Sequence, residues 1–125
     1  MENKEEIIKN YIAAYNRFDV NAMVADMSSN IRFENISGGV VNLAVEGIEA
    51  FKEQAESAKS YFSSRHQAIQ NIQHNGDETV VDISYQAVLA IDLPNGLTKG
   101  RELNLTGKSV FKFRHNKIVA LTDIS

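Results

Sequence analysis

The chain has no cysteine among its 125 residues, so it cannot form a disulfide framework, a thiolate metal site or a cysteine nucleophile. It also lacks an excess of basic residues: 13 Lys and Arg stand against 16 Asp and Glu, which gives a net charge of −3. This balance, without any run of like charges, disfavours binding to nucleic acid or to a membrane surface. No apolar stretch reaches the roughly 18 residues that a membrane-spanning helix needs.

What is present fits a globular protein. Four of the residues from Met1 to Glu6 are charged, and the segment is unlike a signal peptide, so we expect a cytoplasmic location. Hydrophobic residues make up 43% of the chain, which is enough to fill a core. The length suits one domain spanning residues 1–125.

Three helices are predicted in the first half of the chain, where apolar residues recur three or four positions apart. Asn3 is expected to cap the first helix and Asp19 the second, and the third follows Gly47. The apolar faces of these helices comprise Ile8, Tyr11, Ile12 and Tyr15, then Val20, Met23, Val24 and Met27, and finally Ile48, Phe51, Ala55, Ala58 and Phe62.

Strands are predicted where apolar and polar residues alternate, at 31–36, 40–45, 65–74, 79–93, 101–113 and 118–124. Asn75-Gly76 is a two-residue hairpin signal, and Pro94-Asn95-Gly96 marks the next turn. Helices followed by long strands predict an α+β fold, with three helices on a curved, mainly antiparallel sheet that encloses a hollow. Gly107, inside a long strand, is expected to mark a bend or bulge.

Several polar residues are predicted to face that hollow from the first helix and the first strand. Tyr11 and Tyr15 lie on the apolar helix face, where each either donates a hydrogen bond into a pocket or is an ordinary half-buried tyrosine. Phe33 and Asn35 share the inward face of their strand. Asn35 either contacts a ligand or bonds the turn at 37–39.

The later strands add three candidates. His66 is either an acid or base near neutral pH or a structural histidine. Tyr85 and Ser109 lie on the apolar faces of adjacent strands, where each either lines the pocket or fills the core. The three histidines lack the spacing of metal ligands, so we expect neither a metal nor a cofactor.

Carboxylates are not expected in the pocket. Asp82 lies on the face of its strand opposite to the apolar stripe that contains Ile83, and the inward faces of the long strands carry no acidic residue. Hydrolysis by an activated water, which needs a carboxylate, is therefore disfavoured.

Several strings in this order resemble the NTF2-like superfamily, especially its SnoaL-like members. They are Asp19-Val20-Asn21-Ala22-Met23, Gly47-Ile48-Glu49-Ala50-Phe51, and Arg65-His66-Gln67-Ala68-Ile69-Gln70-Asn71 running on to Asn75-Gly76-Asp77. The resemblance covers nearly the whole chain. It implies a cone-shaped fold, frequent homodimers and a pocket at the wide end, but no single activity.

Comparison with ketosteroid isomerase, a member of that superfamily, implies roles for three positions. Tyr11 falls where that enzyme has its oxyanion-hole tyrosine, Asn35 where it has its carboxylate base, and Ser109 where it has a protonated aspartic acid. An amide cannot shuttle a proton, so we expect no ketosteroid isomerase activity. The SnoaL cyclases use a differently placed acidic residue, for which the sequence offers no convincing equivalent.

The sequence therefore predicts a protein that binds a small, mostly apolar molecule. It transforms that molecule, if it is an enzyme, without a metal, as isomerases, cyclases or dehydratases do. The alternative is a non-catalytic dimerisation or protein-binding module. A homodimer is expected through the outer face of the sheet, because Ile69, Val80, Val88 and Val110 are predicted to lie there among polar residues.

Overall fold

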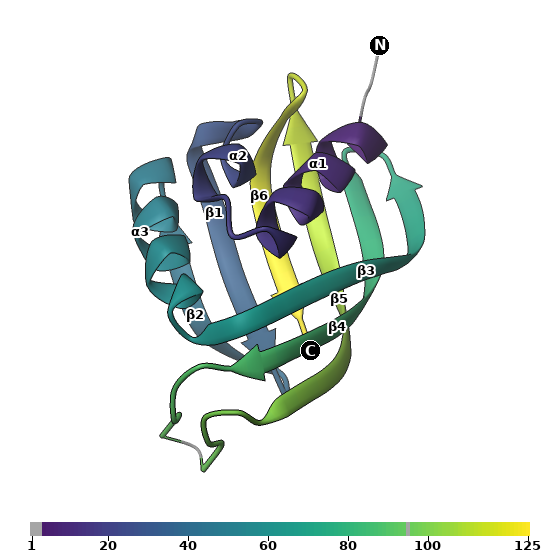
Figure 1. Cartoon of the computed structure of the whole chain (residues 1–125). Coiled ribbons are helices and arrows are strands. Elements are labelled where there is room, and N and C mark those ends of the chain that lie inside the picture. The colour runs from purple at the N-terminus through teal and green to yellow at the C-terminus, as the bar shows by residue number, and fades with distance from the viewer. Residues whose placement is uncertain (1–3, 95) are drawn as a thin grey trace.

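The computed structural model describes residues 4–94 and 96–125, and it combines three helices with one six-stranded sheet (Figure 1). The predicted cap at Asn3, and Asn95 of the predicted turn, lie outside the described residues. The elements in chain order are α1 (Lys4–Asn16), α2 (Val20–Met23), β1 (Met27–Ser37), β2 (Val40–Glu46), α3 (Ile48–Lys59), β3 (Phe62–Asn75), β4 (Glu78–Leu89), β5 (Glu102–Arg114) and β6 (Lys117–Ile124).

The sheet is open and has the strand order β2-β1-β6-β5-β4-β3. All neighbours are antiparallel except β1 and β6, which run parallel. The helices lie on the concave side of the curved sheet, and α1 crosses it toward β3 (Figure 1). The predicted α+β fold with a curved, mainly antiparallel sheet is thus confirmed.

The core lies between the helices and the concave face of the sheet. In β4 its side chains follow the alternation that the sequence predicts, with inward residues two positions apart, whereas a register shift after Ile69 breaks the alternation in β3. The largest fully buried side chains are Ile8, Ile31, Val81, Leu89, Phe111, Ile118, Leu121 and Thr79. The prediction that Ile69 faces outward is wrong, because Ile69 pairs with Ile83 across β3 and β4 and packs against this core.

The end of α1 is held to the edge strand β3 by two side chains. The amide of Asn16 accepts from the backbone N–H of Gln67 at 2.7 Å and donates to its carbonyl at 3.0 Å. Arg65 of β3 donates from Nε to the carbonyl oxygen of Tyr15 at 2.9 Å. A cation at a helix C-terminus compensates carbonyl groups that have no partner within the helix.

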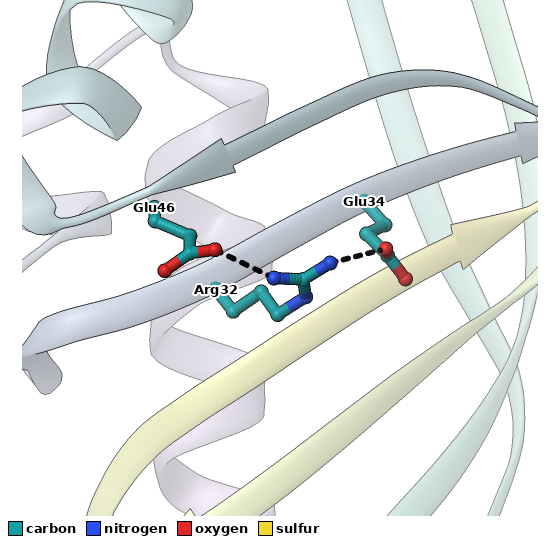
Figure 2. Close-up of polar contacts among 3 residues, drawn as sticks. All are labelled: Arg32, Glu34 and Glu46. Carbon is teal, nitrogen blue, oxygen red and sulfur yellow. Dashed lines mark hydrogen bonds and ion pairs between the residues drawn. The ribbon is translucent and has the colours of Figure 1, made fainter.

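Three charged side chains form a surface cluster on the opposite, outer face of the sheet (Figure 2). Arg32 of β1 contacts Glu34 of the same strand at 3.0 Å and Glu46 of β2 at 2.7 Å. Arg32 therefore ties the edge strand β2 to β1. It points away from the hollow, because Phe33, the next residue, points inward toward Phe51.

Several element boundaries differ from the prediction, most of all at the ends of α2, α3 and β4. The second helix ends at Met23, because the chain turns at Val24. Met27 already begins β1, because the backbone carbonyl of Asp26 accepts from the N–H of Ile118 in β6. The third helix ends at Lys59, so Phe62 begins β3. Strand β4 ends at Leu89 rather than at residue 93, because the N–H of Ala90 bonds the carbonyl of Tyr61.

Gly107 has a role other than the predicted bend or bulge. A Cβ atom there would lie 2.5 Å from the carbonyl oxygen of Ile124 in β6. The register of β5 with β6 shifts between Lys112 and Phe113 instead. Glycine is needed because the backbone of β6 approaches β5 closely at this point.

Replacing Gly107 with alanine is expected to lower the free energy of unfolding by about 1 to 3 kcal/mol, since a backbone atom must move to admit the methyl group. Denaturant unfolding measures this change. Thr106→Ala is the matched control, because Thr106 is exposed on the other face of the same strand. Equal stability of Gly107→Ala and the unmodified protein would contradict the close approach.

Candidate active site

Three polar side chains form a row across three adjacent strands on the concave face. Asn35 of β1 is the register partner of Asp123 of β6, which in turn is the partner of Ser109 of β5. The parallel pairing of β1 with β6 thus brings together residues that are far apart in the sequence. The hydroxyl of Ser109 donates to Oδ1 of Asp123 at 2.7 Å.

This polar row lies in a cavity of about 320 Å³, which we call the Asp123 cavity. Its volume falls in the range of small-molecule pockets. Besides the polar row, its walls contain both aromatic and aliphatic side chains. The lining residues are Tyr15, Asn35, Phe62, Gln67, Ile83, Tyr85, Leu103, Leu105, Thr106, Gly107, Lys108, Ser109, Asp123, Ile124 and Ser125.

Asp123 has an unusual electrostatic environment. Asp123 is partly exposed and lines the cavity, and its carboxyl group is desolvated by the protein around it. Burial raises the pKa of Asp123 to about 6, and the hydrogen bond from Ser109 partly opposes this rise. A carboxyl group with a pKa near neutrality can exist in either protonation state at physiological pH, which suits a general acid or base.

Asn35 contributes an amide to the edge of the cavity. Its Nδ2 donates to Oδ1 of Asn42 in β2 at 2.8 Å, so one of its donor hydrogens is used. The register of β1 with β2 shifts directly after Asn35. The predicted bond to the turn at 37–39 is replaced by this contact with Asn42.

Two tyrosines face the same cavity from opposite elements. The hydroxyl oxygens of Tyr15 in α1 and Tyr85 in β4 are 3.0 Å apart. Burial raises the pKa of both hydroxyl groups. The guanidinium carbon of Arg65 lies 3.7 Å from the centre of the Tyr15 ring and 4.4 Å from that of Phe18.

The structure brings four of the seven predicted site residues to this cavity, namely Tyr15, Asn35, Tyr85 and Ser109. The other three lie elsewhere, so the prediction that Tyr11, Phe33 and Tyr85 share one cavity fails for the Asp123 cavity. Tyr11 is in the core with its ring edge on Phe111, at 5.7 Å between centres, and Phe33 packs on Phe51 at 5.4 Å.

His66 lies on the other side of the sheet. It follows the inward Arg65 by one residue, so strand alternation turns its side chain outward, where it is exposed and lines a separate hollow with Gln86 and Asn104. A role in the Asp123 cavity would require the opposite register.

Asp123 itself is the residue that the sequence reasoning missed, and the expectation of a pocket without a carboxylate is wrong. The available signal was the alternation of the last strand, which places Asp123 on the same face as the buried Leu121. Asp82 does lie outside, where it pairs with Lys108 at 2.9 Å.

Comparison with known proteins now gives the family. The family model of the SnoaL-like domain matches residues 8–121. The chain belongs to the SnoaL-like family. No curated protein matches it.

Solved structures share the fold of this SnoaL-like chain at low sequence identity. A proposed polyketide cyclase from Xanthomonas campestris is 20% identical, with a TM-score of 0.82 over 97% of this chain and 88% of that one. TerC co-crystallised with polyporic acid is 18% identical, with a TM-score of 0.77 over 96% and 88%. A protein of ketosteroid isomerase-like fold from Catenulispora acidiphila, in complex with trimethylamine, is 14% identical. Its TM-score is 0.77 over 98% of this chain and 85% of that one.

Two further observations concern membrane-spanning helices and groups of metal-binding side chains. No helix within residues 4–94 and 96–125 is long and apolar enough to cross a membrane. The same residues contain no group of three or more His, Cys, Asp or Glu side chains that could hold a metal ion.

Asp123→Asn is expected to raise the melting temperature at pH 7 to 8, because a neutral amide replaces a carboxylate that is ionised in a desolvated position. The pKa of about 6 in the folded protein exceeds the value of about 3.9 for an unfolded chain. Protonation of Asp123 therefore adds to the free energy of unfolding. This contribution is complete below about pH 4 and is lost as the pH rises through 6.

Thermal unfolding between pH 4 and 8 measures this difference. The gain from Asp123→Asn should shrink toward pH 4, whereas Ser109→Ala should lower stability most at pH 7 to 8, where it removes a donor to the ionised carboxylate. A gain from Asp123→Asn that is the same at every pH would contradict the raised pKa.

Proposed function

We propose that the protein catalyses acid–base chemistry on a small, mostly apolar carbonyl compound, with Asp123 as the general base. The single observation that carries this proposal is the carboxyl group of Asp123, which lines the cavity, accepts from Ser109 and has its pKa raised by burial to about 6. In the reaction, the carboxylate removes a proton from the carbon beside the carbonyl, which leaves an enolate. The carboxylic acid then returns the proton to the same or another carbon, so the base is regenerated.

The residues around Asp123 support that role. Ser109 donates to one carboxylate oxygen and holds the group in place. Asn35, its neighbour in β1, is an amide, and we maintain that it cannot act as a base. The proposed base therefore stands one strand away from the base position of ketosteroid isomerase, and we expect a substrate other than a steroid of that enzyme's type.

The walls of the cavity support a substrate that is largely apolar. Phe62, Leu103 and Leu105 supply apolar contacts, while the polar groups are concentrated at Asp123 and at the Tyr15–Tyr85 pair. A bicyclic or tricyclic ring compound has a suitable size for about 320 Å³. The polyketide cyclase assignment of one structural neighbour and the polyporic acid bound to another agree with a cyclic, oxygenated compound.

Exchange of hydrogen for deuterium beside a ketone tests this proposal without knowledge of the natural substrate. The protein is incubated with a bicyclic ketone such as 2-tetralone in deuterated buffer, and label incorporation is followed by NMR. The rate should rise with pH and reach half of its maximum near pH 6, because only ionised Asp123 accepts a proton. Asp123→Asn should lower it roughly 10²- to 10⁴-fold.

Asp82→Asn is the matched control, because Asp82 is a carboxylate on the outer face that is paired with Lys108. This variant should catalyse exchange of the ketone at the rate of the unmodified protein. An Asp123→Asn variant as fast as the unmodified protein would refute the proposed base. A ketone that raises the melting temperature without exchanging would instead identify a binding protein.

We also propose a homodimer through the outer face of the sheet. Val80 and Val110 are cross-strand partners there, and with Val88 they remain partly exposed among polar neighbours such as Gln86 and Thr106. Such a mixed surface is typical of interfaces between separately folded partners. The helices and the polar row of Asn35, Asp123 and Ser109 lie on the other face.

Val80→Asp is expected to shift the protein toward monomer, since it would place a carboxylate in the interface of both copies. Sedimentation velocity at micromolar concentration measures the change. Glu56→Gln on the exposed face of α3 is the control and should leave the mass unchanged. A monomeric mass for the unmodified protein would refute this dimer.

A further inference from the structure

The hydrogen bond between Tyr15 and Tyr85 leaves one hydroxyl hydrogen unused. Each tyrosine brings one hydroxyl hydrogen, and their contact at 3.0 Å uses only one of the two, whichever group donates. Both side chains line the Asp123 cavity. The remaining hydrogen is therefore available to an acceptor oxygen of a molecule inside the cavity.

Arg65 places a buried positive charge directly behind this pair. Only 5% of the residue is exposed, and its guanidinium group lies over the rings of Tyr15 and Phe18. Its Nη2 has no hydrogen-bond partner among the described residues, and none of their carboxylates forms an ion pair with it. A buried charge without a counter-ion is unfavourable, so a ligand that brings negative charge nearby gains from it.

We infer that the Tyr15–Tyr85 pair is an oxyanion subsite, in which the free hydroxyl hydrogen binds a phenol or enol oxygen and Arg65 stabilises the negative charge that this oxygen acquires. Arg65 acts through Tyr15 as a positioning residue, because it does not line the cavity itself. The subsite rests on the proposed function only in sharing its cavity. It takes over the donor role that the resemblance implied for Tyr11.

The chemistry of the cavity favours a weakly acidic oxygen over a carboxylate. Asp123 lines the same space, and its ionised form repels a ligand that carries a permanent negative charge. A phenol or enol enters as a neutral molecule and becomes negative only as its proton is shared or removed. The pair and Arg65 then stabilise the charge where it develops.

Binding of 4-nitrophenol, with 4-nitroanisole as the ether of similar shape, tests the subsite. The absorbance of the phenol reports its ionisation directly. We expect the unmodified protein to bind the phenol about tenfold more tightly than the ether, which corresponds to one hydrogen bond to a charged group. Tyr85→Phe should remove most of that difference. Tyr61→Phe should not, because Tyr61 does not line the cavity.

The ionisation of the bound phenol tests Arg65. Arg65→Gln should raise the pKa of bound 4-nitrophenol by roughly 1 to 3 units, whereas Arg65→Lys, which retains the charge, should restore most of the shift. If Arg65→Gln does not fold, the Tyr85→Phe measurement still decides whether the tyrosine pair binds the phenol oxygen. A phenol bound no more tightly than its ether, or bound equally by Tyr85→Phe, would overturn the subsite.

Asp123→Asn separates this inference from the proposed function. It should lower exchange beside the ketone roughly 10²- to 10⁴-fold and yet strengthen binding of the ionised phenol, since a negative charge is removed from the cavity. If Asp123→Asn still catalyses exchange and still prefers the phenol to its ether, the role of Asp123 as the base is refuted and the subsite is not. Normal exchange without phenol selectivity would refute the subsite alone.

Discussion

The docking of the end of α1 on the edge strand β3 is the contact on which the rest of the concave face depends. Asn16 extends the hydrogen bonding of β3 as a short strand would, and Arg65 donates to the carbonyl of Tyr15 near the end of the helix. Together they set the distance between helix and sheet, and thereby place Tyr15 against Tyr85. Without this anchor the helix could slide along the sheet, and the cavity would lose one wall.

The same interior holds two opposite charges that are kept apart. Arg65 lies under the helix end against aromatic rings, and Asp123 lies on β6, where its carboxyl group accepts from Ser109. A protein shaped only for stability would pair these groups or replace them with apolar residues. Their separation keeps the proposed base in the wall of the cavity and the proposed stabilising charge behind Tyr15, which is the arrangement that the proposed proton transfer needs.

Periodicity in the sequence predicted most of the fold because side-chain burial follows the helix and strand repeats. It placed Tyr85 and Ser109 on the inward face correctly, since both lie in long strands with regular alternation. It could not distinguish Tyr11 from Tyr15, because both lie on one helical face. The structure buries Tyr11 more deeply than Tyr15. Alternation in the last strand could have placed Asp123 on the inward face, but no local pattern indicates the parallel pairing that brings residue 123 beside residue 35.

The close approach at Gly107 also limits how this protein can adapt to new ligands. The wall formed by β5 has a rigid inner section, where any side chain at Gly107 would collide with the backbone of β6. Leu103 and Leu105 lie on the same strand and the same face, and Leu105 is 50% exposed at the rim. Substitutions at Leu103 and Leu105, whether natural or engineered, can therefore reshape the entrance of the cavity while the section at Gly107 stays constant. Ligand preference can then change without a change around Asp123.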